Sequence, residues 1–95
     1  MIYRNKKLLD AAKDSPQCFG CGLPNDGTVV AAHSNQQRDG KGMGHKAHDC
    51  RVAYLCRECH DILDKSPLPR HAKQEIFEEA WRRTVLHWFE TGVVK

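Results

Sequence analysis

Two closely spaced cysteine pairs constrain what this chain can fold into more than any other feature of its sequence. Cys18 and Cys21 form one CxxC pair, Cys56 and Cys59 form a second, and 34 residues lie between the pairs. Two residues between thiols let both sulfurs of a pair reach one tetrahedral ion, with zinc–sulfur bonds of about 2.3 Å. The pattern predicts a structural zinc ion held by four thiolates, which leaves no open position for a substrate.

Two other chemistries use cysteine pairs of this kind. A redox-active dithiol is typical of a thioredoxin-like βαβ unit, and the sequence indicates no such unit. An iron site of the rubredoxin type also uses CxxC pairs, but that domain consists mainly of loops and short strands, which a long C-terminal helix does not suit. Structural zinc is therefore favoured over both. The fifth cysteine, Cys50, is interpreted as a small apolar residue that is buried or partly buried.

The chain is short enough to need a metal for stability. It has 95 residues, of which 40% are hydrophobic and 7% aromatic, and an apolar core of this size supplies on the order of 3–5 kcal/mol. Zinc bound by four thiolates can contribute on the order of 10 kcal/mol to folding. We therefore expect a single zinc-bound domain over residues 1–95.

The sequence also indicates where in the cell the protein is located. The N-terminus has no apolar segment typical of a secretory signal, and paired cysteines in a protein that is not exported favour metal binding over disulfides. The longest aliphatic run, residues 29–32, is far shorter than the roughly 20 residues that span a bilayer. We expect a cytoplasmic protein with no membrane partner.

Propensity and turn signals predict short elements around the cysteines. Good helix formers indicate an N-terminal helix over residues 4–13, and β-branched residues indicate strands at 28–32 and 52–55. A helix is expected from about residue 57 to residue 65, so that the second cysteine pair lies at its start. Residues 34–49 are polar and rich in glycine and are expected to form a loop.

The C-terminal segment carries the clearest periodicity. Apolar residues recur at helical offsets over residues 69–91, with Pro69 suited to the first turn and Gly92 to the C-terminal stop. The helix is expected to lie across the zinc-bound part, and its tryptophans are interpreted as core residues rather than as ligand-stacking groups. The apolar stripe consists of Ala72, Ile76, Phe77, Ala80, Trp81, Val85 and Trp88.

Four further residues form a second candidate site. His33 ends the first predicted strand, Asp49 precedes the second, and His60 and Asp64 lie on one face of the short helix. A one-metal nuclease needs such an arrangement: one side chain takes a proton from water, while nitrogen and carboxylate ligands hold a divalent cation against the phosphate. Taken singly, His60 is more often a neighbour of the zinc site, His33 a capping residue and Asp64 a solvated charge.

Together these motifs resemble a known family. The order CxxC, strand ending in His, glycine-rich loop and LCxxCH resembles the zinc-bound branch of the HNH endonucleases, which have a ββα-metal core of the treble-clef type. More narrowly, residues 32–35, 38–44, 46–49 and 56–64 resemble the small YbcO-like nuclease family of phages and prophages, over about residues 16–95. The resemblance implies a small α+β zinc-bound domain: an HNH-like core over residues 16–66 with an N-terminal helix and a long C-terminal helix.

The resemblance also implies roles for individual residues. His33 would be the general base and His60 a ligand of a catalytic cation, Mg2+ or another divalent ion, in an enzyme that hydrolyses DNA phosphodiester bonds in a bacterial host cell. HNH enzymes usually carry Asp or His before the base, where this chain has Ala32. Further ligation therefore falls to Asp49 or Asp64. The alternative function is a non-catalytic zinc module that binds nucleic acid or a phage protein.

The charge of the chain is concentrated in its N-terminal half. Residues 1–47 carry seven Lys and Arg against four acids, whereas residues 48–95 carry eight of each. Arg38, Lys41 and Lys46 lie in the glycine-rich loop, where small residues let a phosphate approach the backbone and cations bind it. They are candidates for nucleic-acid binding. The alternative, an exposed loop that binds no ligand, is given equal weight.

Overall fold

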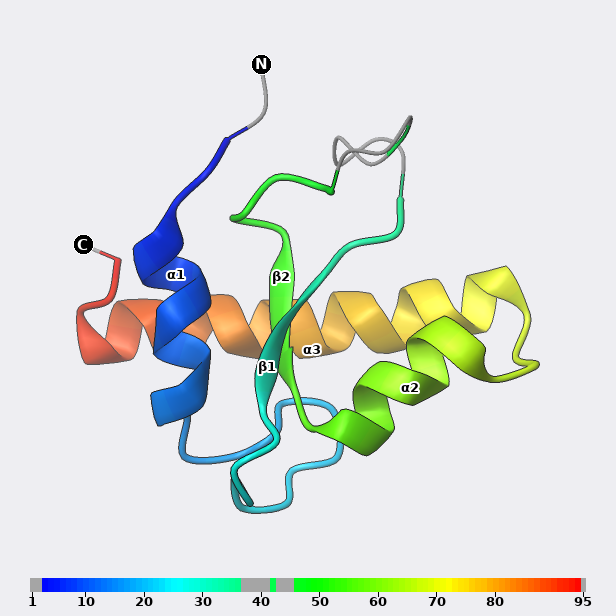
Figure 1. Ribbon diagram of the computed structural model, residues 1–95, viewed down its shortest axis with the longest axis horizontal. Coiled ribbons are helices and arrows are strands. Elements are labelled where there is room, and N and C mark those ends of the chain that lie inside the picture. The colour runs from blue at the N-terminus through cyan, green and yellow to red at the C-terminus, as the bar shows by residue number, and fades with distance from the viewer. Residues whose placement is uncertain (1–2, 37–41, 43–45, 95) are drawn as a thin grey trace.

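A two-stranded antiparallel hairpin lies at the centre of the computed structural model (Figure 1). The structure describes residues 3–36, 42 and 46–94. Strand β1 (Val30–His33) pairs with strand β2 (Val52–Leu55), so that Val30 faces Leu55 at one end of the hairpin and His33 faces Val52 at the other. The expected strand 28–32 is displaced towards His33, because Thr28 bonds the turn at Asp26 and the N-terminus of the next helix instead.

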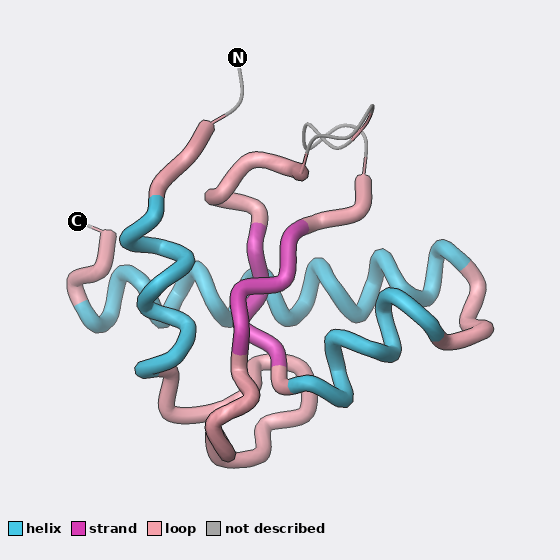
Figure 2. The backbone as a smooth tube through the Cα atoms, viewed as in Figure 1, coloured by secondary structure: helices cyan, strands magenta, loops and turns pink. Residues whose placement is uncertain are grey.

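Helices surround the hairpin. Helix α1 (Lys6–Asp10), which continues into the 3-10 turn η1 (Ala11–Asp14), and helix α2 (Arg57–Lys65) lie on either side of it. Helix α3 (Arg70–Thr91) passes behind the strands in the view of Figure 2 and contacts β2. None of the helices in the described part of the chain is long and apolar enough to cross a bilayer.

Local signals explain where the helices begin and end. Asn5 caps α1, since its side-chain oxygen accepts a hydrogen bond from the Lys7 N–H at 3.1 Å. The expected helix over residues 4–13 therefore starts two residues late, and the chain before it is extended. Gly92 ends α3 in the left-handed conformation, with φ of 78°, as its position in the sequence predicts.

The core is built around Tyr54 in the fully buried strand β2. Its hydroxyl donates to the carbonyl of Leu8 in α1 and accepts from Nε1 of Trp88 in α3, the latter at 2.8 Å. Its backbone N–H donates to Oγ1 of Thr84 at 3.1 Å. Burial raises the pKa of Tyr54, although the bond from Trp88 opposes the rise, so the phenol remains protonated at neutral pH. One side chain thus joins β2 to both α1 and α3.

The apolar stripe of α3 is confirmed in part. Phe77, Ala80 and Trp88 are buried, whereas Ile76 is 37% exposed and Trp81 only partly buried. Thr84, a polar residue outside the expected stripe, is fully buried, because its hydroxyl donates to the carbonyl of Ala80 while it accepts from β2. Trp81 instead stacks under the guanidinium of Arg51, at 4.3 Å from its ring centroid.

Candidate metal centre and histidine site

The four cysteines of the two pairs converge on one point. Their Sγ atoms all lie within 4.8 Å of one another, and those of Cys21 and Cys56 are 3.9 Å apart. A tetrahedral ion with bonds of about 2.3 Å requires sulfur–sulfur distances of about 3.8 Å. The donor set and its spacing therefore fit a single metal ion such as zinc. The predicted grouping of Cys18, Cys21, Cys56 and Cys59 is confirmed as a cluster that could bind a metal.

Two local structures present these sulfurs. The first pair lies in a tight turn, in which the Cys18 N–H donates to the Leu23 carbonyl and the Gly22 N–H donates to the Cys18 carbonyl, both at 2.9 Å. Gly22 has φ of 79°, a backbone conformation that residues with a side chain rarely adopt. The second pair begins α2, with Cys56 at the N-cap position. The positive end of this helix favours thiolates over thiols.

Backbone N–H groups further stabilise one thiolate. Sγ of Cys18 accepts hydrogen bonds from the N–H groups of Cys56, Gly20 and Cys21, at 3.2, 3.3 and 3.5 Å. Burial alone would raise the pKa of Cys18, but these bonds outweigh it and lower the pKa to about 7. Burial and the neighbouring sulfurs raise the pKa of Cys59. A bound cation would reverse that rise, since metal binding releases the protons of its thiol ligands.

Gly20 is packed closely against the cluster. A Cβ atom at this position would lie 3.0 Å from Cδ2 of Leu55 and 3.1 Å from Sγ of Cys59. Side-chain carbons essentially never come closer than the first of these distances. A side chain at this position would therefore require Leu55 or Cys59 to shift by a few tenths of an ångström.

The opposite end of the hairpin carries the first histidine of the second candidate site. Nε2 of His33 lies 2.8 Å from Oδ1 of Asp49, and the His33 side chain is 15% exposed. The structure thus joins two of the four predicted residues in one hydrogen bond. Its consequence is that the imidazole is held in a fixed orientation by a carboxylate.

Asp49 is buried and accepts from three groups. Besides His33, Nη1 of Arg4 donates to Oδ1 at 3.1 Å and the backbone N–H of Asn5 donates to Oδ2 at 2.7 Å. Burial alone would raise the pKa of Asp49, but the bonds from His33 and Asn5 and the charge of Arg4 outweigh it, so the pKa is lowered. Asp49 is therefore ionised at neutral pH, and Nε2 of His33 is the donor in their bond.

The other two predicted residues form a separate pair on α2. Nε2 of His60 lies 3.4 Å from Oδ2 of Asp64, and both side chains are about two-fifths exposed, at 38% and 41%. Nδ2 of Asn35, two residues beyond β1, reaches Oδ1 of Asp64 at 3.5 Å. This contact brings the chain just after His33 alongside the face of α2 that carries the pair.

The predicted role of Asp49 as a cation ligand with His60 or Asp64 stays a prediction. No hydrogen bond or ion pair among the described residues joins Asp49 to either of them, and its oxygens already accept from protein donors. Among residues 3–36, 42 and 46–94, one group of three or more His, Cys, Asp or Glu side chains lies close enough together to hold a metal ion. This group is the four cysteines. Of the four predicted residues, His60 and Asp64 form the exposed pair.

The N-terminal segment contributes two residues that the sequence did not single out. Arg4 and Asn5 both donate to Asp49, although 45 and 44 positions, respectively, separate them from it. In the sequence these residues fall within the expected helix. The cap signal of Asn5, an asparagine just before a run of helix formers, could have shown that residues 3–5 lie outside the helix.

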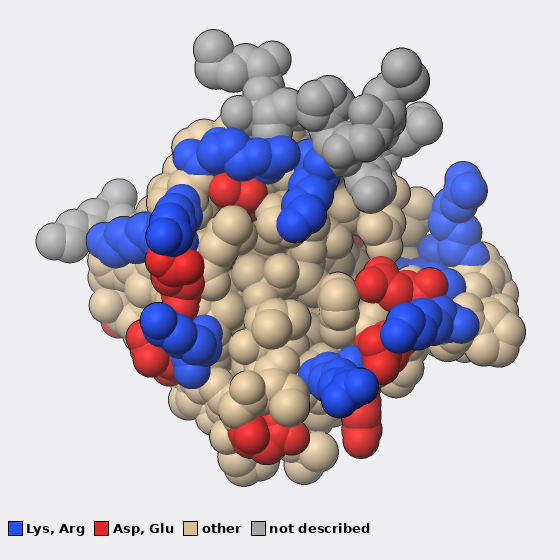
Figure 3. Space-filling view, viewed as in Figure 1, with Lys and Arg blue, Asp and Glu red and all other residues tan. Residues whose placement is uncertain are grey.

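The basic loop is described in part. Arg38 and Lys41 lie outside the described residues. Lys46 is exposed, and its carbonyl accepts from Nη2 of Arg4 at 3.0 Å. Figure 3 shows basic and acidic side chains close together around the rim of one face.

The expected burial of Cys50 is wrong. Its side chain is exposed, because the residue lies in the turn that leads into β2. Its carbonyl is the part that makes contact, and it accepts from Nε1 of Trp81 at 2.8 Å. The four-cysteine cluster does not include Cys50.

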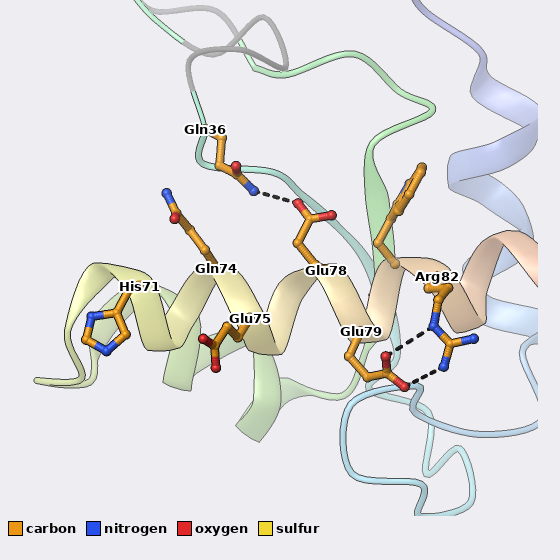
Figure 4. A pocket seen from close by; sticks show the side chains of 8 residues that line it. Gln36, His71, Gln74, Glu75, Glu78, Glu79 and Arg82 are labelled. Atoms are coloured by element: carbon orange, nitrogen blue, oxygen red, sulfur yellow. Dashed lines mark hydrogen bonds and ion pairs between the residues drawn. The ribbon is translucent and has the colours of Figure 1, made fainter.

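A shallow hollow runs along the N-terminal half of α3 (Figure 4). Two of the three glutamates that line it are paired within the protein. Glu78 accepts from Nε2 of Gln36 at 2.8 Å and pairs with Arg51, and Glu79 pairs with Arg82 at 2.7 Å. None of the cysteines of the cluster lines this hollow, and neither does His33 or Asp49.

Comparisons with protein-family models, with curated proteins and with solved structures found no match to this chain. The resemblance to the HNH endonucleases therefore stays a prediction. The described part of the chain is a small α+β fold with a two-stranded sheet, three helices and a four-cysteine cluster that could bind a metal ion.

Proposed function

We propose that this protein is a zinc-bound nuclease of the HNH type that hydrolyses DNA phosphodiester bonds with His33 as its general base. One observation carries the proposal: Nε2 of His33 bonds to the buried carboxylate of Asp49 at 2.8 Å. In the neutral imidazole, the proton on Nε2 leaves a lone pair on Nδ1. No described residue bonds Nδ1, and the side chain is 15% exposed; the proposal requires that water reach this nitrogen.

The order of the elements supports a treble-clef core. A tight turn carries Cys18 and Cys21, the β1–β2 hairpin follows, and α2 begins with Cys56 and Cys59. The proposed zinc ion would join the turn to the helix and take no part in the chemistry, because four thiolates leave it no open position.

The proposed reaction uses the His33–Asp49 pair as follows. Nδ1 of His33 takes a proton from water while the water oxygen bonds to phosphorus and the bond from phosphorus to the leaving oxygen breaks. The leaving oxygen is protonated by solvent. The ionised carboxylate of Asp49 holds the ring in place and stabilises the imidazolium that forms, as a carboxylate does for the histidine of a hydrolase triad.

A catalytic cation belongs to the proposal through His60 and Asp64. This exposed pair would supply one nitrogen and one carboxylate ligand, and phosphate oxygens of the substrate would complete the shell. When bound, a divalent cation offsets negative charge on the phosphate. Asp49 is left out of this shell, because it bonds His33, Arg4 and Asn5.

A second function is favoured by the incomplete ligand set. Ala32 occupies the position before His33, where an acid or histidine would add a ligand, and the His60–Asp64 pair supplies only two. A zinc module that binds nucleic acid or a protein without cleaving it needs no such shell. DNA binding without cleavage is the outcome that would select this function.

The experiment is a nicking assay on supercoiled plasmid with the zinc-loaded protein and added Mg2+ or Mn2+. We expect cleavage by the parent, and a rate lower by at least about 100-fold for His33→Ala, because general-base catalysis contributes about 10²–10⁴-fold. His71→Ala, which alters an exposed histidine on α3, is the matched control and should cleave like the parent. Equal cleavage by the parent and by His33→Ala would exclude His33 as the base.

A further inference from the structure

Arg4 lies against the same carboxylate oxygen as His33. Its Nη1 donates to Oδ1 of Asp49 at 3.1 Å, and Nε2 of His33 lies 2.8 Å from that atom. Because both groups contact the same oxygen of Asp49, the guanidinium of Arg4 and the imidazole of His33 are neighbours. The N-terminal segment therefore places a permanent positive charge beside the proposed general base.

The guanidinium is held at one edge and open at the other. Nη1 also donates to the Ala47 carbonyl at 2.7 Å, and Nη2 donates to the Lys46 carbonyl at 3.0 Å. No described residue accepts from Nε, and the side chain is 45% exposed. A guanidinium has five N–H donors. The edge formed by Nε and Nη2 thus retains two donors in the fork geometry that matches a phosphate.

The backbone around Arg4 fixes this arrangement. The Tyr3 N–H donates to Nδ1 of His48 at 2.8 Å, the Tyr3 carbonyl accepts from the Asp49 N–H at 3.0 Å, and the Asn5 N–H donates to Oδ2 of Asp49 at 2.7 Å. Arg4 is therefore anchored on both sides before any ligand arrives. A side chain positioned in advance loses less entropy on binding than a free surface arginine does.

We infer that Arg4 binds a backbone phosphate of DNA through its Nε–Nη2 edge, beside His33. The inference rests on the proposed function, since it supplies the phosphate-binding group of the same site. Lys46 is exposed next to Arg4 along the chain that Arg4 contacts, and it adds a second positive charge there. Binding of one phosphate by each cation releases counterions, which makes the affinity depend on salt.

The test is a titration of a labelled DNA duplex by fluorescence anisotropy across a series of salt concentrations. The zinc-loaded protein is used without added Mg2+ or Mn2+, so that the DNA stays intact. We expect Arg4→Gln to weaken binding and to reduce the slope of log affinity against log salt by about 0.9, the value of one duplex phosphate contact. Arg4→Lys should keep the slope of the parent and lose affinity, because lysine keeps the charge and lacks the fork.

Arg70→Gln is the matched control. Arg70 is exposed at the start of α3 and is not among the residues that bond Asp49, so this variant removes the same charge outside the proposed site and should keep the slope of the parent. If Arg4 only held residues 46–49 in place, both Arg4 variants would weaken binding and neither would change the slope. That result would overturn the inference. Absence of DNA binding by the parent would overturn the proposed function together with the inference, whereas an unchanged slope for Arg4→Gln would overturn the role of Arg4 alone.

Discussion

Nε2 of His33 and Oδ1 of Asp49 lie 2.8 Å apart, although sixteen positions separate the two residues. The contact joins the end of β1 to the segment that leads into β2, and so closes the loop between the strands at its base. Arg4 and Asn5 add two further donors to the same carboxylate. A single buried acid thus joins the hairpin, the loop and the N-terminal segment.

Asp49→Asn should change how stability depends on pH. The pKa of Asp49 is lower in the folded protein, because bonds from His33 and Asn5 and the charge of Arg4 outweigh the effect of burial. A lowered folded pKa means that the stability from Asp49 is present above the unfolded pKa and is lost as pH falls through the folded pKa. We expect the variant to lose about 1–3 kcal/mol at neutral pH and to show a shallower decline in acid.

Urea unfolding at a series of pH values measures both effects. Asp10→Asn is the control, because Asp10 is exposed and caps no helix through its side chain. It should reproduce the pH dependence of the parent. Curves of equal shape for Asp49→Asn and the parent would contradict the role given to the Asp49 carboxylate.

Removal of one cysteine of the cluster should abolish metal binding and folding together. Cys59→Ser breaks a four-sulfur set that could hold one ion, and a site of this type contributes on the order of 10 kcal/mol. We expect about one zinc per chain in the parent, measured by elemental analysis, and loss of the cooperative thermal transition after strong chelation.

Cys50→Ser is the internal control for that experiment. Cys50 is exposed and lies outside the cluster, so its replacement should leave both the zinc content and the melting temperature of the parent unchanged. A folded Cys59→Ser protein without metal would show that the apolar core suffices alone.

Gly20→Ala tests the close packing of the turn over the sulfurs. The added Cβ would lie 3.0 Å from Cδ2 of Leu55 and 3.1 Å from Sγ of Cys59. Since one neighbour is a fully buried leucine side chain and the other belongs to the cysteine cluster, we expect a loss of about 1–3 kcal/mol and weaker zinc binding. Competition with a chromogenic chelator measures the affinity; a variant that binds zinc as the parent does would show that the turn relaxes freely.

Tyr54→Phe tests the hydrogen bonds of the core. The variant leaves the buried Leu8 carbonyl and Nε1 of Trp88 without their partner, so we expect a loss of about 1–3 kcal/mol, measured by urea unfolding. Tyr3→Phe is the control, because the Tyr3 hydroxyl is exposed and bonds only Nδ2 of the nearby Asn5 among the described residues. Its unfolding free energy should match that of the parent.

The sequence predicts those parts of the structure that rest on local signals. The CxxC spacing anticipates the cysteine cluster, and the predicted bounds of β2 and α2 agree with the structure. Pro69 and Gly92 mark the two ends of α3. Each of these signals depends on residues within a few positions of one another, so a single sequence suffices to recognise it.

The partners of Asp49 could not be predicted in the same way. Arg4 and Asn5 reach it across 45 and 44 positions, and no local pattern encodes such a distance. The burial of Thr84 was not predicted for a related reason: a polar residue is expected outside the core unless its hydrogen-bond partners are known. Its partners in the structure are the Ala80 carbonyl and the Tyr54 N–H. In both cases the fold decides which polar groups are satisfied.

The hairpin has four residue pairs, from Val30 with Leu55 to His33 with Val52. Side chains along a strand alternate between faces, so a slip of one position would turn the imidazole of His33 to the face on which Ala32 is now buried. Cys56 directly follows Leu55, so an ion held by the four sulfurs would set the phase of this alternation. Metal binding at the cysteine end of the hairpin would thereby determine which face of the sheet carries the His33 side chain at the opposite end.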